Sequence, residues 1–407
     1  MRVALISEHA SPLAILGGVD AGGQNVHVAA LAQHLAARGH DVTVYTRRDR
    51  PLDDLPERVD LHGVTVVHVP VGPATYLPKD DLLPLMPDFA DWMLHDWSRH
   101  ARPDIMHAHF WMSGLAAARA ADATGIPMAQ TFHALGTVKR RHQGAEDTSP
   151  PSRIADEAYV GRRADAIIAT CSDEVSELRR AGVDTARTSV VPCGVDTDLF
   201  RPGEHQDRGP DLGPMLLSVA RLVPRKGVET VIRALAQLPT ARLLVIGGPP
   251  AARLGDDPEA ARLVRIARSL GVHGRVRFAG SVAHEQMPAA YQAADVVVAS
   301  PWYEPFGITP VEAAACGRPV VGTAVGGLLD TVVEGTTGFL VPPRDPAALA
   351  AAIARITSSP RLLRLCGVRA AERAQERYSW SRVAEQTEAV FRDTLSRTGT
   401  TVGSGSR

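Results

Sequence analysis

The sequence has few cysteines, and their positions argue against some common kinds of site. Only four occur in 407 residues, and none belongs to a CxxC pair. Such scattered cysteines disfavour both a disulfide framework and a structural zinc site, and they are typical of a protein from a reducing compartment. We therefore expect free thiols and a cytoplasmic location.

Long apolar runs are also missing. No run approaches the roughly 20 residues that a membrane-spanning helix needs. The first residues, MRVALISEHASP, contain neither an apolar h-region nor a small-residue cleavage site, so we expect no signal peptide. The sequence thus predicts no integral membrane contact.

Neither sign of charge is in excess. The 44 Lys and Arg residues nearly balance the 45 Asp and Glu residues, for a net charge of −1. This balance argues against a nucleic-acid-binding protein and against a strongly basic membrane binder. The length exceeds that of one ordinary hydrophobic core, so two domains are expected.

The sequence does contain a regular alternation of short β-branched runs and longer segments rich in Ala, Leu and Arg. Continuous apolar strands that alternate with helices are typical of parallel sheets covered on both faces. The expected strands form two series: 2–6, 41–46, 64–69, 104–109, 127–132, 165–170 and 188–192, then 215–220, 242–247, 275–280, 295–300, 319–323 and 338–341.

One segment rich in Pro, Gly and Asp, residues 190–214, interrupts the alternation and is predicted to link two domains. We expect an α/β fold of two doubly wound, Rossmann-like domains that face each other across a cleft. The first covers 1–195, with a closing amphipathic helix at 379–396 that packs back on it, and the second covers 196–378. Residues 397–407 are expected to be disordered. Ligands of such sheets bind at the carboxyl ends of the strands.

The stretch SPWYEPFGITPVEAAACGRPVVGTAVGGLLD, residues 300–330, follows one of these strands. Thr309 is a suitable helix N-cap, and one interpretation is that Glu312 merely closes a capping box with it. In the other interpretation, Gly307 and the Gly326-Gly327 pair let backbone amides approach an anion. Glu312 can then accept bonds from ribose hydroxyls, and Glu304 from sugar hydroxyls.

Cations follow another strand of the second series, in SVARLVPRKGVET. Arg221, Arg225 and Lys226 are either a solvated loop or ligands of a diphosphate, which Arg can bind through two parallel bonds. Their position at a strand end favours the second interpretation.

With Glu304-x7-Glu312, its GITPVEAAACGRPVV context and Arg221 with Lys226, the sequence resembles the retaining glycosyltransferases of the GT-B fold, in the large family 4. The resemblance covers essentially the whole chain. It implies that Arg221 and Lys226 hold the diphosphate, Glu312 the ribose and Glu304 the donor sugar. The donor-binding set is expected to comprise Gly22, Gly23, Asn25, Arg221, Lys226, Glu304, Phe306, Gly307, Ile308, Thr309 and Glu312.

The amino-terminal half offers a second glycine-rich segment, GGVDAGGQNVHVAALAQHL at 17–35. Gly22 and Gly23 can bring amides against a phosphate, and Asn25 can bind substrate; alternatively this is an ordinary loop before a helix. No GxGxxG follows the first strand, which disfavours a dinucleotide site.

Histidines follow two strands of this half. His107 and His109 lack a third ligand at suitable spacing, so we expect core or cleft histidines and no metal. Asp196 and Asp198 lie in the linker, where Asp favours turns. The family resemblance implies that His133 touches the donor sugar near the reacting centre, which gives His133, Arg221, Lys226 and Glu304 as the expected catalytic residues.

Within the family, HAHFWMSG, TFHALGTVK, PSRIADE and GPATYLPKDDL resemble the enzymes that join N-acetylglucosamine to inositol phosphate. The resemblance implies an acceptor site of Lys79, Thr131 and Arg153. Phe110 replaces the expected phosphate-binding tyrosine, and Gln24 and His27 also differ from the usual residues. A GGQ-type loop is shared with sucrose-phosphate synthases, so the acceptor stays open.

The expected reaction moves a hexose or N-acetylhexosamine, with UDP-GlcNAc as the favoured donor, to a small polyhydroxylated acceptor such as a cyclitol or cyclitol phosphate. Retention, independence of any metal or cofactor, and no nucleic-acid partner are expected, and a homodimer stays open. The alternatives are a sucrose-phosphate-synthase-like or GDP-mannose-dependent transferase, an epimerase or phosphorylase, and a non-catalytic sugar-nucleotide-binding protein.

Overall fold

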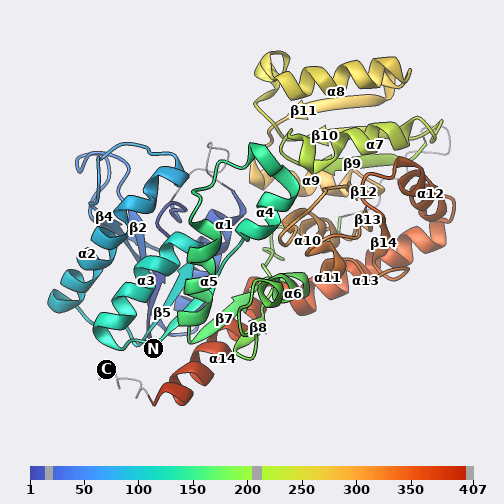
Figure 1. Ribbon diagram of the computed structural model, residues 1–407. Helices are drawn as coiled ribbons and strands as arrows, with labels where there is room; N and C mark the ends of the chain where they lie inside the picture. The colour runs from blue at the N-terminus through green and yellow to red at the C-terminus, as the bar shows by residue number, and fades with distance from the viewer. Residues whose placement is uncertain (14–21, 204–212, 400–407) are drawn as a thin grey trace. The chain divides into compact units, whose positions relative to one another are not determined.

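Two units make up the chain, each built around its own sheet (Figure 1). The computed structural model describes residues 1–13, 22–203 and 213–399. The first unit contains Met1–Cys193 together with Trp380–Arg407, and the second contains Gly194–Ser379. Part of the expected linker, 204–212, and most of the expected disordered tail, 400–407, lie outside the described residues.

The first unit contains an eight-stranded sheet in the order β3-β4-β2-β1-β5-β6-β7-β8. All of its pairings are parallel except the one between β3 and β4 at one edge. The strands are β1 Arg2–Ile6, β2 Asp41–Arg47, β3 Arg58–Leu61, β4 Val64–Val69, β5 Ile105–His109, β6 Met128–Thr131, β7 Ala166–Ala169 and β8 Thr188–Val190.

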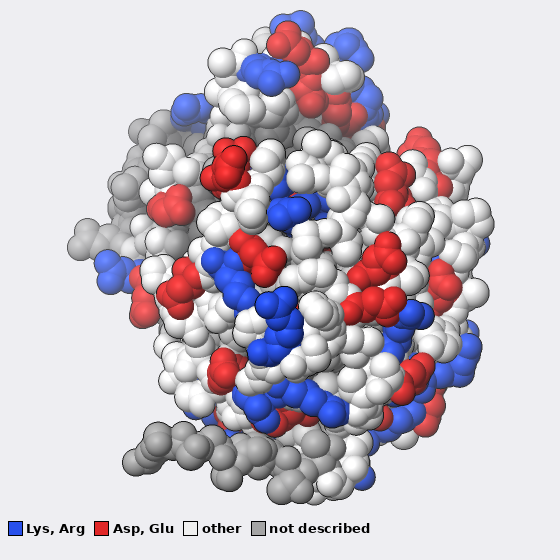
Figure 2. All heavy atoms as spheres, turned by 90° about the vertical axis from the view of Figure 1, so that its left-hand side faces the viewer, with Lys and Arg blue, Asp and Glu red and all other residues white. Residues whose placement is uncertain are grey.

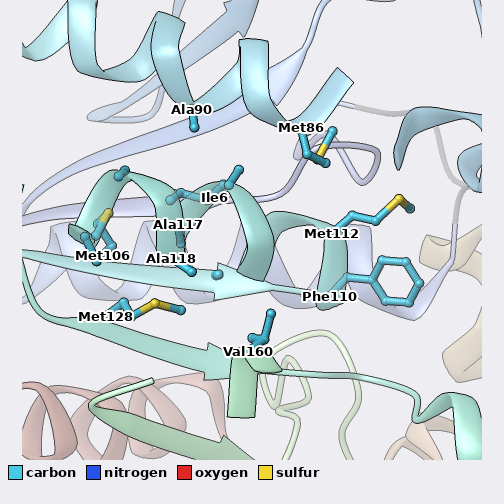
Figure 3. Packing of buried hydrophobic residues seen from close by; sticks show 14 of the residues in the cluster. Ile6, Met86, Ala90, Met106, Phe110, Met112, Ala117, Ala118, Met128 and Val160 are labelled. Atoms are coloured by element: carbon cyan, nitrogen blue, oxygen red, sulfur yellow. The ribbon is translucent and has the colours of Figure 1, made fainter. Parts of the chain in front are cut away.

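Helices cover both faces of this sheet. They are α1 Gly23–Ala37, α2 Met86–Arg99, α3 Trp111–Thr124, α4 Gly136–Gln143, α5 Arg153–Arg163, α6 Ser172–Arg180 and α14 Trp380–Thr398, with short 3-10 turns η1 Lys79–Leu85 and η2 Gly144–Glu146. Because side chains alternate along a strand, Ala4 and Ile6 of β1 pack under α2 and α3, whereas Val3 and Leu5 pack against α1 and α14. Figure 3 shows the first of these cores, with the ring of Phe110 at the end of β5.

The second unit contains a six-stranded, wholly parallel sheet in the order β11-β10-β9-β12-β13-β14. Its strands are β9 Met215–Val219, β10 Arg242–Ile246, β11 Val276–Gly280, β12 Val296–Ala299, β13 Val320–Thr323 and β14 Gly338–Val341. Its helices are α7 Val228–Leu235, α8 Pro258–Ser269, α9 Met287–Gln292, α10 Ile308–Ala315, α11 Leu328–Thr331, α12 Pro346–Thr357 and α13 Pro360–Tyr378, with 3-10 turns η4 Pro224–Lys226, η5 Ala251–Asp256, η6 His273–Arg275 and η7 His284–Gln286. Apolar residues of α7, α8 and α12 form a core with these strands.

The expected α/β fold with two parallel sheets is confirmed, and each expected strand is present within a residue or two of its predicted ends. The antiparallel edge strand β3 was not predicted. Its sequence, RVDL, carries too few apolar residues to stand out from a loop.

The structure also bears on the scarcity of cysteine, the lack of long apolar runs and the balance of charge in the sequence. None of the four cysteines forms a disulfide, as expected, and all four are buried. Within the described residues, no helix combines the length and the apolar character that crossing a membrane requires. Figure 2 shows one face of the molecule, where Lys and Arg alternate with Asp and Glu and neither sign covers the face.

Candidate active site

The loop after β12, residues 300–307, is held from one side by the turn after β9. Ser300 Oγ donates to the carbonyl of Gly227 at 2.8 Å, and the Trp302 amide donates to the carbonyl of Arg225 at 2.8 Å. Gly227 has φ +70°, and a Cβ there would overlap the carbonyl oxygen of Ser300. Only glycine fits both this conformation and this approach.

The glycine pair after β13 holds the same loop from the other side. The Gly327 amide donates to the carbonyl of Glu304 at 3.0 Å. Gly326 has φ +48°, and a Cβ there would overlap that same carbonyl oxygen. The loop that carries Glu304 is therefore fixed between two glycine turns that come from distant parts of the sequence.

Lys226 and Glu304 meet in an ion pair, Nζ to Oε2. Their side chains are only 19% and 16% exposed, so water screens the pair less than it would a surface pair. Two of the expected catalytic residues are thus in direct contact. Arg221 is exposed at the end of β9, and Arg225 lies over the ring of Tyr303, with Cζ 5.3 Å from the ring centroid.

Glu312 occupies a different position from the one its capping role would require. Helix α10 begins at Ile308, and Gly307, with φ +89°, is its N-cap without a side-chain bond. The prediction of Thr309 as the N-cap was therefore wrong, because Gly307, in a left-handed conformation, caps the helix two residues earlier. Glu312 is buried instead and accepts a hydrogen bond from the Tyr291 hydroxyl at 2.7 Å.

Burial also sets the ionisation of this carboxyl group. It raises the pKa of Glu312, while the hydrogen bond from Tyr291 opposes that shift. Tyr291 was not identified from the sequence, since a lone tyrosine in α9 has no spacing relation to α10. The structure places it under the carboxylate expected to bind ribose, as a support that fixes the orientation of Glu312.

In the first unit, two expected site residues follow neighbouring strands with unusual backbone conformations. Phe110 has φ +80° directly after β5, and His133 has φ +59° shortly after β6. Positive φ is uncommon for residues other than glycine, and such outliers occur preferentially at functional sites. The Phe110 amide donates to the carbonyl of Thr131 at 2.8 Å, which helps to hold the two strand ends together.

The expected acceptor residues Lys79, Phe110 and Arg153 come together. Arg153 Cζ lies 5.2 Å and Lys79 Nζ 6.0 Å from the centroid of the Phe110 ring. The aromatic face is thus contacted by two cations, a favourable arrangement. These three residues come from a turn, a strand end and a helix start, which are separated widely in the sequence.

Arg153 is nonetheless tightly bound by the protein itself. Its guanidinium donates to Glu157 at 2.8 Å, to Ser149 Oγ at 3.1 Å and to the carbonyl of Ala134 at 2.8 Å. Its side chain is 2% exposed. The i,i+4 spacing of Arg153 and Glu157 on a helix is the one signal that could have indicated this partner from the sequence.

Thr131 does not join this group through its hydroxyl. The hydroxyl donates to the carbonyl of Ile168 on β7 at 2.9 Å and lies 2.9 Å from His107 Nε2. Its side chain is buried within the sheet. The structure therefore gives Thr131 a role in holding β6 to β7.

The glycine-rich segment before α1 is described only from Gly22 onward, and 17–21 lie outside the described residues. The Gly22 amide donates to Asn25 Oδ1 at 3.0 Å, and Asn25 Nδ2 donates to the carbonyl of Ser11 at 3.0 Å. Asn25 is buried and organises the start of its own helix. At Gly22, an added Cβ would meet no atom of the described residues within 4 Å.

Histidines gather behind the strand ends of the first unit. The predicted His107, His109 and His133 are joined by His27 from α1, which sequence spacing did not reveal as a neighbour. Burial lowers the pKa of His27 to about 4 and that of His107 to about 3, and it lowers those of His109 and His133 well below the usual value. All four rings are neutral at pH 7. Asp196, by contrast, caps a turn by accepting from the amides of Asp198 and Leu199.

Comparisons with known proteins identify the family of this chain. The family described as glycosyl transferases group 1 matches residues 204–373, and glycosyltransferase family 4 matches residues 21–199. A D-inositol 3-phosphate glycosyltransferase 2 from Catenulispora acidiphila is 38% identical over 96% of this chain and 94% of that protein. A D-inositol 3-phosphate glycosyltransferase from Mycobacterium tuberculosis is 38% identical over 96% of this chain and 83% of its own length.

Solved structures show the same fold. Sucrose-phosphate synthase from Thermosynechococcus elongatus superimposes with a TM-score of 0.86 at 34% identity, over 97% of this chain and 99% of that one. Anabaena HepE in complex with UDP-glucose superimposes with a TM-score of 0.73 at 23% identity, over 98% and 100% of the two chains, which supports the fold alone.

The two parallel-sheet units, together with these relatives, identify the chain as a glycosyltransferase of the GT-B fold. The chain belongs to the family 4 glycosyltransferases, and within that family it is close to the D-inositol 3-phosphate glycosyltransferases.

Proposed function

We propose that this enzyme transfers N-acetylglucosamine from UDP-GlcNAc to a hydroxyl of a cyclitol or cyclitol phosphate, with retention of the anomeric configuration and without a required metal. The Lys226–Glu304 pair, fixed between two glycine turns, is the observation that carries the proposal. The proposal is further supported by the relatives named for D-inositol 3-phosphate.

The donor half-site lies in the second unit. Glu312, oriented by Tyr291, accepts the ribose hydroxyls, and the first amides of α10 after Gly307 face the diphosphate. Lys226 and Arg221 hold the phosphate oxygens. Because Glu304 is paired with Lys226, a bound sugar whose hydroxyls engage Glu304 is brought next to the cation that stabilises the leaving group.

The acceptor half-site lies in the first unit, around the Phe110 ring. Lys79 provides positive charge for a polyhydroxylated or anionic acceptor, and Arg153, whose charge is paired with Glu157, lies against the same ring. Phe110 has no hydroxyl to donate to a phosphate, and a hydrogen bond to a charged group contributes about 1.5–3 kcal/mol. We therefore infer that the enzyme binds an acceptor phosphate more weakly than it would with a tyrosine at position 110.

The chemical step breaks the bond between the anomeric carbon and the diphosphate oxygen and forms a bond from the acceptor oxygen on the same face. The negative charge that develops on the leaving phosphate is stabilised by Lys226 and Arg221, an electrostatic contribution of several kcal/mol. The leaving phosphate takes the proton of the attacking hydroxyl. The neutral imidazole of His133 orients the sugar, and it is itself held by His109, whose Nδ1 lies 3.0 Å from His133 Nε2.

One screen tests the proposal. The purified enzyme is incubated with UDP-, GDP- and dTDP-sugars against inositol, inositol phosphate and other cyclitols, and the products are identified by mass spectrometry and NMR. UDP-GlcNAc consumption that depends on a cyclitol, gives an α-linked product and survives EDTA is the expected result. An inverted product would contradict retention, and turnover without any acceptor would favour an epimerase.

A sucrose-phosphate-synthase-like transfer is the second candidate, favoured by the 34% identity to that structure over nearly the whole chain. Its distinguishing observation would be UDP-glucose consumption with a hexose phosphate as the acceptor. Adding a hexose phosphate to the acceptors of the same screen lets one experiment separate the two candidates.

A further inference from the structure

Three histidines from three separate elements converge inside the first unit. His27 lies on α1, His109 ends β5, and His133 follows β6. One ring nitrogen of each residue lies within 4.8 Å of the others. His27 and His109 are buried and His133 is half-buried, so the group is reached from the side of His133.

The hydrogen bonding of these rings is incomplete. His27 Nδ1 and His109 Nε2 are buried without a hydrogen-bond partner among the described residues. His109 Nδ1 lies 3.0 Å from His133 Nε2. Buried polar groups are rarely left unpaired, and each such group calls for an explanation. A site that takes a ligand would account for the unpaired Nδ1 of His27.

The surroundings fix the rings and keep them neutral. The His107 ring is tilted against that of His109, with the ring centroids 4.1 Å apart, and His107 Nε2 is held at Thr131. Trp380 meets the His27 ring edge-on, with the centroids 5.4 Å apart. Burial and the neighbouring histidines hold the pKa values of His109 and His133 well below the usual range. Neutral imidazole is the form that binds metals, so no proton has to be removed before coordination.

We propose that His27, His109 and His133 form a binding site for a divalent transition metal of the zinc type. Imidazole ligands suit Zn²⁺, Cu²⁺ and Ni²⁺, and three of them leave an open fourth position. With metal–nitrogen bonds of about 2.0–2.1 Å, two ligands of a tetrahedral ion lie roughly 3.3 Å apart. His109 Nδ1 and His133 Nε2 already approach that spacing, and a ring nitrogen of His27 lies within 4.8 Å of the other two ligand atoms.

The tautomers can be balanced without loss of a proton. Two neutral imidazoles share one N–H in the His109–His133 hydrogen bond, and a metal ion between those nitrogens takes the place of that proton. When His109 is the donor, its proton moves to Nε2, which has no other bond. Coordination therefore exchanges one hydrogen bond for two metal bonds.

The site has a consequence for transfer that rests on the proposed role of His133. An ion on His133 removes the imidazole from the donor sugar, so occupancy inhibits the reaction while the reaction itself needs no metal. The enzyme would then be slowed by free zinc and restored by a chelator.

Metal titration of the full chain tests the site directly. The protein is treated with EDTA, dialysed and titrated with Co²⁺ by visible absorption, then with Zn²⁺ by calorimetry. His27→Phe keeps a ring in the core but removes both nitrogens, and His133→Ala changes a loop residue that the core does not need. His95→Gln, at an exposed position of α2, is the matched control for a surface histidine.

The expected result is one equivalent of Zn²⁺ bound by the wild type and by His95→Gln, with affinity at least tenfold lower in His27→Phe and in His133→Ala. Circular dichroism and melting in EDTA establish that each variant is folded. Wild-type affinity in folded His133→Ala or His27→Phe would overturn the site, as would the absence of a bound equivalent in the wild type.

Activity measurements then distinguish a failure of the metal site from a failure of the proposed function. Zinc that inhibits the wild type but not His27→Phe supports the whole inference. Tight binding that leaves transfer unchanged would support the site and contradict the role of His133 at the donor sugar. A chain that binds zinc but shows no transfer with any sugar nucleotide would leave the site standing and overturn the proposed function.

Discussion

The two candidate half-sites are held together in different ways. In the second unit, backbone groups make the close contacts: Gly227, Gly326 and Gly327 let three loops touch, and one ion pair joins them. In the first unit, side chains make them, as in the network of Arg153 with Glu157 and Ser149. Contacts made by backbone groups depend little on side-chain identity, whereas side-chain contacts can be changed by substitution.

This comparison predicts that glycine substitutions act mainly on the stability of the second unit, whereas charge or hydroxyl substitutions act on function in either unit. The largest effect is expected at the Lys226–Glu304 ion pair of the donor half-site. Lys226→Ala removes the cation beside the leaving phosphate, so kcat should fall at least 100-fold, or roughly 3 kcal/mol. Steady-state kinetics with saturating donor measures this change.

Arg225→Ala is the matched control for that prediction. Arg225 lies next in sequence and stacks on Tyr303, so its loss should leave kcat within a fewfold of wild type. If Lys226→Ala retained kcat/KM within about twofold, well under the ~1.4 kcal/mol of a tenfold change, the assignment of the diphosphate site would fail.

Gly227→Ala should destabilise the second unit by about 3 kcal/mol, because the new Cβ overlaps the Ser300 carbonyl and φ is +70°. Chemical denaturation, monitored for each unit's transition, measures this loss. Gly274→Ala is the control, since that glycine has open surroundings and no positive φ. Equal stability of the two variants would show that the close approach of the loops is not required.

A buried carboxyl group should make the folding stability of the first unit depend on pH. Burial raises the pKa of Glu174 from 4.5 to about 7, while Thr170 donates to its Oε2 through both its amide and its hydroxyl. The folded state thus keeps a proton that the unfolded state loses near pH 4.5. Stability contributed by this proton is present below that pH and is lost as the pH rises through 7.

Glu174→Gln removes this dependence. It should leave the free energy of unfolding unchanged at pH 4.5 and raise it above pH 7, by at most about 3 kcal/mol for a shift of that size. Urea unfolding at both pH values gives the comparison. If the free energy of unfolding of the variant rose equally at pH 4.5 and pH 8, the result would contradict a buried, protonated carboxyl group.

The smallest predicted effect concerns the acceptor. Phe110→Tyr adds a hydroxyl beside Lys79 and Arg153, so it should lower KM for inositol phosphate about tenfold relative to free inositol. Competition between the two acceptors in one reaction measures the ratio. An unchanged preference would place the acceptor phosphate away from this ring.

The extent of sequence-based prediction follows the same contrast. Strands and glycine turns have local signals, so the two sheets and the motif at 300–330 were predictable. The convergence of Arg153 on Phe110 was expected only through the family resemblance. Tyr291 under Glu312 and His27 beside His133 were missed, because a contact between distant segments leaves no spacing in the sequence. The helix start at Ile308 was misplaced because a threonine and a glycine both offer caps, and the glycine accepts the left-handed backbone that the close loops require.

Because the closing helix α14 is made last, the order of synthesis affects how the first unit folds. Trp380 and Phe391 complete the core under β1 and α1, yet the entire second unit separates them from those elements in the chain. As the polypeptide leaves the ribosome, the second unit is continuous and can fold as soon as it emerges. The first unit must wait with one apolar sheet face uncovered until the last helix is released. Chaperone dependence and early aggregation should therefore originate in the amino-terminal half, although it is the half that is made first.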